Sequence, residues 1–126
     1  MELRIDIETF GGEKAYAKYS NFLVRSDREN FRLTFGSYRG NAGDSLTGRA
    51  NNSEFSTFDR DNDKISKSCA VAYDSGWWFK DCFHANLNGP YVPGGETLSW
   101  KEIIWDDFKG GKESMKRSEM KIRPEM

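Results

Sequence analysis

The chain has 126 residues, of which 31% are charged, and its formal net charge at pH 7 is -1. This length suits one domain with a modest core, and the near-neutral charge argues against a partner such as nucleic acid or an anionic membrane. No apolar run is long enough to span a bilayer, and the first residues lack the basic and apolar segments of a signal peptide. Aromatic residues make up 14% of the chain, which indicates either a core between irregular loops or a binding surface.

The first 35 residues show the alternation of half-buried strands. Apolar residues occupy every second position over 3–7, again over 15–19 with an apolar extension to 24, and again over 31–35. Gly11-Gly12 separates the first two runs as a hairpin turn would. These patterns predict a three-stranded antiparallel meander.

The rest of the chain is mostly irregular. Glycines among Asn, Asp and Ser residues predict a loop over 36–56 with one helical turn near 44–46, and we expect Phe55 and Phe58 to anchor its end to the core. Proline and glycine predict another loop over 91–96. Apolar residues at 115, 120 and 122, among charged ones, predict a final strand.

A run of alternating carboxylates, D-R-D-N-D, occupies residues 59–63. Groups at every second position point the same way, and like charges repel unless a cation neutralises them. Calcium suits such a cluster because it takes hard oxygen ligands. The EF-hand pattern does not fit, because Lys64 and Ala70 stand where it needs Gly and Glu. The spacing alone leaves a calcium loop and a solvated acidic turn as alternatives.

Cys69 and Cys82 flank an aromatic turn. A disulfide between them would close a short loop and remove about 3 kcal/mol of unfolded-state entropy. A zinc site formed by the two cysteines and His84 is disfavoured, because the chain lacks a paired C-x-x-C and a second histidine. A nucleophilic Cys82 activated by His84 would need a free thiol, which a disulfide does not leave. Since serine motifs and phosphate-binding loops are also missing, the sequence predicts that the protein is not an enzyme.

Several long motifs follow one another in a fixed order. They are A-Y-A-K-Y (15–19), A-G-D-S-L (42–46), F-S-T-F-D-R-D-N-D (55–63), G-W-W (76–78), A-N-L-N-G (85–89) and M-K-R-S-E-M-K-I-R-P (115–124). Together with the two cysteines, they resemble the fibrinogen C-terminal domain over essentially the whole chain. Within that family the chain is most similar to ficolins, tachylectin-like lectins, microfibril-associated proteins and angiopoietin-like proteins.

The resemblance implies an α+β fold of the fibrinogen C-terminal type, with an antiparallel sheet followed by an irregular, loop-rich subdomain that binds calcium and ligand. We expect residues 1–126 to form one partial domain, with the sheet over about 1–50 and the binding subdomain over about 51–126. The full family domain begins earlier, with a subdomain that carries its own disulfide. Without those strands we expect Leu3, Ile5, Phe31 and Phe35 to be partly uncovered and the isolated chain to be marginally stable.

The resemblance also implies the calcium ligands. In the family, the second and third aspartates of D-x-D-x-D contribute side chains, and backbone carbonyls two and four residues later complete the protein ligands. These positions are Asp61, Asp63, Ile65 and Lys67, and Asp59 would act through water. The Ca²⁺ ion would hold the segment just before Cys69 in place.

A ligand pocket is implied as well. In the acetyl-binding lectins of the family, the peptide bond before the second cysteine is cis, and its amide helps to hold the acetyl oxygen among aromatic side chains. Phe83 stands where those lectins carry histidine. A fibrinogen-type pocket, which binds a peptide N-terminus through acidic side chains, fits this sequence less well than the acetyl pocket, because Tyr73 replaces an acidic residue there. The implied ligand-binding residues are Tyr73, Asp81, Cys82, Phe83, His84 and Trp100.

These observations predict a secreted, calcium-binding module that is lectin-like and binds acetylated glycans in innate defence. The cysteine pair and the glycosylation pattern at Asn51-Asn52-Ser53 favour the secreted location. The alternatives are a protein–protein interaction module of the extracellular matrix or of receptor signalling, and a truncated fragment without binding activity. We expect acetylated glycans or extracellular proteins as partners, no nucleic acid, no membrane insertion, and homo-oligomers formed through upstream regions.

Overall fold

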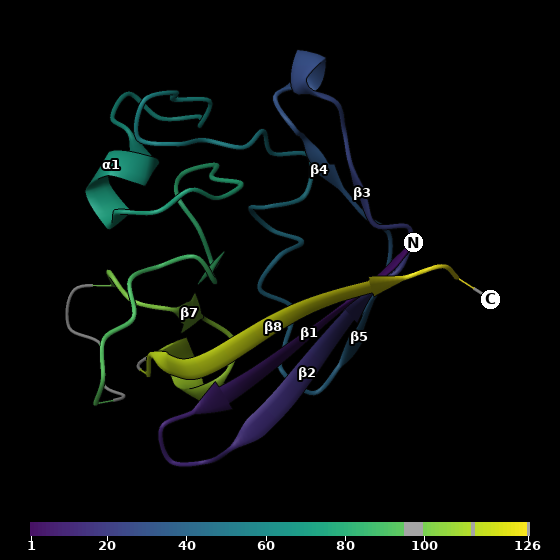
Figure 1. The fold of residues 1–126 in the computed structure, drawn as a ribbon, viewed down its shortest axis with the longest axis vertical. Coiled ribbons are helices and arrows are strands. Elements are labelled where there is room, and N and C mark those ends of the chain that lie inside the picture. Colours follow the sequence, from purple (N-terminus) through teal and green to yellow (C-terminus); the bar gives the residue numbers. More distant parts are fainter. Residues whose placement is uncertain (95–99, 112, 126) are drawn as a thin grey trace.

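The computed structural model describes residues 1–94, 100–111 and 113–125. Its largest element is an antiparallel sheet with strand order β5-β2-β1-β8 (Figure 1). Two small strand pairs and three short helical segments complete the fold. The elements are β1 (Glu2–Thr9), β2 (Lys14–Tyr19), β3 (Leu23–Val24), η1 (Asp27–Glu29), β4 (Leu33–Thr34), β5 (Tyr38–Gly40), α1 (Cys69–Tyr73), β6 (Ala85–Asn86), β7 (Ile104–Trp105), η2 (Lys109–Gly111) and β8 (Met115–Arg123). The predicted class, a sheet followed by an irregular half, is confirmed.

The alternating residues of β1 and β2 form the base of the core. Leu3 and Ile5 of β1 are each 1% exposed, and Tyr19 of β2 is fully buried. Because successive side chains of a strand point to opposite faces, the charged residues between them lie on the outer face of the sheet. The final predicted strand is confirmed as β8, which pairs with β1 along its whole length, from Glu2↔Arg123 to Thr9↔Met115.

The predicted three-stranded meander is wrong in its third member. Residues 31–35 do not join the sheet of β1 and β2; part of them forms β4, which pairs with β3 in a separate two-stranded sheet. Asn30 and Phe31 have positive φ angles of 52° and 56°, so an extended run cannot begin there. Instead β5 pairs with the outer edge of β2.

Three further expectations differ from the structure. Four apolar residues were expected to be partly uncovered, but Leu3 and Ile5 are buried and Phe35 is only 9% exposed. Phe31 is the one of the four that is exposed, at 45%. Phe58 does not anchor the end of the 36–56 loop to the core, because it is 79% exposed. The strand β8 belongs to the sheet although the predicted boundary near residue 50 placed it in the other subdomain.

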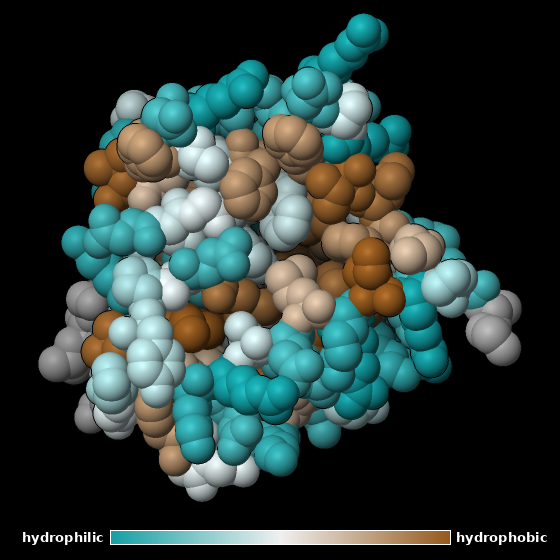
Figure 2. Space-filling view, in the orientation of Figure 1, coloured by the Kyte–Doolittle hydropathy of each residue, from teal (hydrophilic) through white to brown (hydrophobic). Residues whose placement is uncertain are grey.

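Polar and apolar residues are separated on the surface. In Figure 2, hydrophilic side chains gather over the strands β8, β1 and β2, whereas apolar side chains gather over the β3–β4 pair. The exposed residues Leu23, Val24 and Phe31 contribute to the second region. Within the described ranges, the helices are all too short and too polar to cross a bilayer.

Candidate ligand-binding and calcium site

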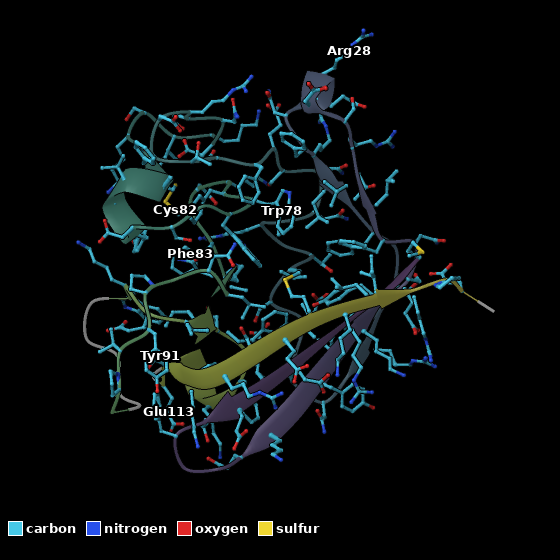
Figure 3. All side chains as sticks on the ribbon, viewed as in Figure 1. Arg28, Trp78, Cys82, Phe83, Tyr91 and Glu113 are labelled. Carbon is cyan, nitrogen blue, oxygen red and sulfur yellow. A yellow bond between two sulfur atoms is a disulfide. The ribbon has the colours of Figure 1, made fainter. Side chains whose placement is uncertain are left out.

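A disulfide holds the candidate site together. Cys69 and Cys82 are bonded, with Cα atoms 5.6 Å apart, and Cys69 is fully buried. Cys69 opens the short helix α1, whose N-cap Ser68 accepts a hydrogen bond from the Val71 backbone N–H through its hydroxyl. In Figure 3, Cys82 lies beside α1, and Phe83 lies next to it toward β7. The bridge therefore joins the helix to the chain segment that forms the site.

The backbone around Cys82 has an unusual path. The Asp81–Cys82 peptide bond is cis, and the Lys80 N–H donates to the Cys82 carbonyl at 2.9 Å. After this turn the chain enters β6, which pairs with β7. Asn86 and Asn88 support the turn, because the Asn86 side chain accepts a hydrogen bond from the Ser75 hydroxyl and the Asn88 side chain donates one to the Gly76 carbonyl.

Trp77 and Trp78 pack behind the site. Trp77 is 1% exposed, its ring lies edge-on to that of Trp78 at 5.1 Å, and the Trp78 indole N–H donates to the Phe31 carbonyl at 2.8 Å. Both side chains are therefore structural, as the sequence predicts.

All six residues expected to bind ligand line one cavity of about 360 Å³. Tyr73, from the last turn of α1, and Phe83 form its aromatic wall, with ring centroids 4.9 Å apart and nearly perpendicular planes. Trp100 lies at the edge, with a positive φ of 62°. The neighbouring Leu98 and the end of the predicted 91–96 loop lie outside the described residues.

One ion pair and one histidine–carboxylate hydrogen bond border the cavity, and the sequence did not indicate either of them. Arg49 lies 3.3 Å from the Asp81 carboxylate, and His84 Nδ1 lies 3.2 Å from the Asp106 carboxylate. The Asp106 N–H also donates to the His84 carbonyl at 2.9 Å, which fixes the two residues relative to each other. Arg49 and Asp106 are far from Cys82 in the sequence, so no local pattern could have identified them.

The acidic loop at residues 61–67 is folded around its own carboxylates. Asp61 accepts a hydrogen bond from the Asp63 N–H at 3.1 Å. Asp63 accepts from Ile65 N–H at 3.1 Å through one oxygen and from Cys69 N–H at 2.8 Å through the other. The Lys64 N–H donates to Lys80 O at 2.8 Å, so the loop is docked against the irregular segment that leads to Cys82.

The donor chemistry of this loop fits calcium. Within the described residues, no cluster of three or more His, Cys, Asp or Glu side chains is placed to hold a metal. The implied site does not require one, because it uses two carboxylates, from Asp61 and Asp63, and two backbone carbonyls, from Ile65 and Lys67. Neither of those carbonyls accepts a hydrogen bond from any described residue, so both remain available to an ion. If calcium is bound, these four residues would hold it.

The loop and the cavity share residues. Ile65 and Lys67, which would offer their carbonyls to the ion, also line the cavity beside Tyr73 and Cys82. An ion that fixes the backbone at these two positions would therefore fix one wall of the cavity.

Comparison with known proteins identifies the family of the chain. The model of the family "Fibrinogen beta and gamma chains, C-terminal globular domain" matches residues 1–125. The chain belongs to the fibrinogen C-terminal domain family. It is 41% identical to the human fibrinogen alpha chain over 97% of its own length and 16% of the relative, and 41% identical to human angiopoietin-related protein 6 over 98% of its length and 26% of the relative.

Solved structures of fibrinogen C-terminal domains have the same fold. The fibrinogen-like globe domain of human ANGPTL6 has a TM-score of 0.93 and 40% identity, covering 99% of this chain and 57% of that one. The lamprey fibrin D-dimer complexed with the peptide Gly-His-Arg-Pro-amide has a TM-score of 0.87 and 31% identity, covering 94% of this chain and 44% of that one. The chain thus spans about half of these two solved chains and a smaller part of the curated relatives. Its family consists of binding modules and not of enzymes.

Proposed function

We propose that this domain is an extracellular recognition module whose cavity beside Cys82 binds the acetyl group of an N-acetylated glycan. The observation that carries the proposal is the convergence of Tyr73, Phe83 and the Asp81–Cys82 backbone on one cavity. Small ligand sites of this kind combine apolar walls with a few well-placed polar groups. The extracellular location is part of the proposal, and the Cys69–Cys82 disulfide supports it because disulfides persist in oxidising compartments.

The cavity offers complementary contacts to both ends of an acetyl group. The edge-to-face pair of Tyr73 and Phe83 supplies an apolar wall for the methyl group. The Cys82 N–H donates no hydrogen bond to any described residue, so it is free to donate to the acetyl carbonyl oxygen.

The charges around the cavity favour a neutral ligand over a cationic one. Asp81 and Asp106 are the carboxylates that line it, and each is already paired, with Arg49 and with His84. A cationic ligand such as a peptide N-terminus would have to displace one of these partners, whereas an acetamido group would not.

Calcium would contribute by fixing the cavity wall. Held by Asp61, Asp63 and the carbonyls of Ile65 and Lys67, the ion would restrict the backbone where Ile65 and Lys67 line the cavity. Preorganisation of this kind raises affinity because less conformational freedom is lost on binding.

The test is a calorimetric titration of the 126-residue chain with N-acetylglucosamine and with glucosamine, in calcium and in EDTA. We expect binding of the acetylated sugar alone, and weaker binding in EDTA. Tyr73→Ala should weaken binding by about tenfold, whereas Tyr91→Ala, at an exposed ring outside the cavity, should leave it unchanged. Equal binding of both sugars, or none in the presence of calcium, would refute the proposal.

Peptide binding is a second candidate, because the lamprey fibrin relative was solved with a peptide. The two candidates differ in their response to acetylation of the ligand. If Gly-His-Arg-Pro-amide binds with its free amine and loses affinity once that amine is acetylated, the cavity is a peptide site. The opposite order of affinities supports the acetyl site.

A further inference from the structure

The outer face of the four-stranded sheet carries a row of cationic residues that crosses every strand. In the strand register, Lys121 of β8 lies opposite Arg4 of β1, Arg4 lies opposite Lys18 of β2, and Lys18 lies opposite Arg39 of β5. Neighbouring strands are about 4.8 Å apart, so this basic row extends over about 14 Å.

The basic row is unfavourable for the sheet itself. Like charges directly opposite each other on neighbouring strands are destabilising, and here each cross-strand pair in the row is of that kind. Two carboxylates relieve part of the repulsion. Asp6 pairs with Arg4 at 3.0 Å and with Lys121 at 2.6 Å, and Glu2 lies 3.6 Å from Arg39.

This relief is incomplete. Lys18 forms no salt bridge with any described residue, and Glu2 is shared with Arg123 at 2.9 Å. The pKa of Glu2 is lowered by its hydrogen bond from Arg123, and that of Asp6 is lowered by Arg4 and Lys121, which shows that the charges of both carboxylates are already engaged. Packing does not explain the row, because these side chains lie on the solvent face.

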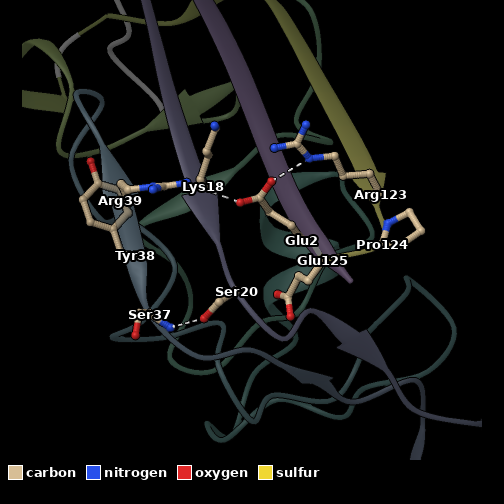
Figure 4. Close-up of a pocket in the computed structure, with 9 residues that line it drawn as sticks. All are labelled: Glu2, Lys18, Ser20, Ser37, Tyr38, Arg39, Arg123, Pro124 and Glu125. Carbon is tan, nitrogen blue, oxygen red and sulfur yellow. Dashed lines mark hydrogen bonds and ion pairs between the residues drawn. The ribbon is translucent and has the colours of Figure 1, made fainter.

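The residues of the basic row line two adjoining hollows. A hollow of about 600 Å³ is lined by Lys18, Arg39 and Arg123, and Figure 4 shows Glu2 between Arg123 and the other two. A second one, of about 320 Å³, is lined by Arg4 and Lys121 together with Lys18 and Arg123. The side chains of Arg39 and Lys121 are 70% and 52% exposed, so an extended ligand can reach them.

We propose that the basic row binds a linear sulfated polysaccharide. Its charge and extended shape complement a chain with repeated anionic groups, and complementary charge favours rapid, salt-sensitive association. Single-stranded nucleic acid would need exposed aromatic rings on which bases stack. Tyr16, on the same face, is covered by Arg4 at 4.6 Å from its ring centroid. Tyr38, which lines the larger hollow, packs against the Tyr19 ring at 5.6 Å, and its hydroxyl accepts a hydrogen bond from the Gly43 N–H. The preference for a polysaccharide also rests on the extracellular location proposed above.

The probe is heparin, with fully desulfated heparin as its control, in surface plasmon resonance of the 126-residue chain at about 0.15 M salt. We expect heparin to bind, desulfated heparin not to bind, and affinity to fall as salt rises. The variant K18Q/R39Q/K121Q should bind heparin about tenfold more weakly. The variant R25Q/R28Q/K64Q removes the same charge from exposed positions away from the row and should change affinity less than about twofold. Figure 3 shows Arg28 projecting from η1, away from the sheet.

Equal losses in the two variants, or equal binding of desulfated heparin, would overturn the proposal. Binding of duplex DNA or of phosphatidylserine vesicles as tight as that of heparin would also overturn it, because the face would then respond to negative charge in general. N-Acetylglucosamine should not displace heparin, since the acetyl cavity lies elsewhere. Heparin binding can therefore persist if the acetyl proposal fails, and the acetyl site can persist if heparin does not bind.

Discussion

Asp63 is expected to stabilise the domain in two separable ways, and Asp63→Ala tests both. Its carboxylate accepts hydrogen bonds from the backbone N–H groups of Ile65 and Cys69, at 3.1 and 2.8 Å. The side chain is half-buried, so each bond is worth about 1 kcal/mol net. In EDTA the variant should therefore lose about 2 kcal/mol of unfolding free energy.

Calcium should widen that difference. An ion that binds the folded state alone stabilises it by about 2.7 kcal/mol when its concentration is a hundred times the dissociation constant. We expect the wild type to gain this amount in urea denaturation with calcium, and Asp63→Ala to gain almost none. Asp59→Ala is the control, because Asp59 accepts a hydrogen bond from Thr57 and is not expected to contact the ion directly.

Two results would refute this reasoning. If calcium stabilises Asp63→Ala as much as the wild type, Asp63 is not a ligand. If the variant loses nothing in EDTA, the two backbone hydrogen bonds do not stabilise the loop.

Three other predictions concern the scaffold. Tyr19 is fully buried and its hydroxyl donates to Asp44 at 2.8 Å, so Tyr19→Phe should lower the unfolding free energy in urea by about 2 kcal/mol at pH 7. Burial alone would raise the pKa of Asp44, but hydrogen bonds from Thr47 and Tyr19 keep it below the usual 3.8. The stability due to Asp44 is thus present above pH 3.8 and is lost as the pH falls through the lower pKa of the folded state. Asp44→Asn should therefore reduce the loss of unfolding free energy between about pH 4 and lower pH. If the unfolding free energies of the variant and the wild type fall in parallel as the pH is lowered, the prediction is contradicted. A Cβ at Gly89 would meet Glu102 O at 1.9 Å, so Gly89→Ala should cost about 3 kcal/mol in the same assay, and a loss below about 1 kcal/mol would contradict the close approach.

Much of the site was accessible from local sequence. The alternation of Leu3, Ile5 and Ile7 was sufficient to predict β1, because one buried face imposes a period of two. The cysteine pair and the acidic loop could be read from residues that lie close together in the chain, whereas the six ligand-binding positions were implied by the resemblance to the family. Their grouping around one cavity is what the resemblance implied and what the structure shows.

The sequence by itself therefore determined the three long strands β1, β2 and β8, the loop that carries the carboxylates, and the family to which the chain belongs. The tertiary structure decided how distant segments meet: that β8 pairs with β1, that β5 and not residues 31–35 pairs with β2, and that Arg49 reaches Asp81. The basic row exists for the same reason, since each of its cations comes from a different strand. Strand pairing is a long-range choice among several compatible edges, and local periodicity reports which face of a strand is buried without specifying its neighbour.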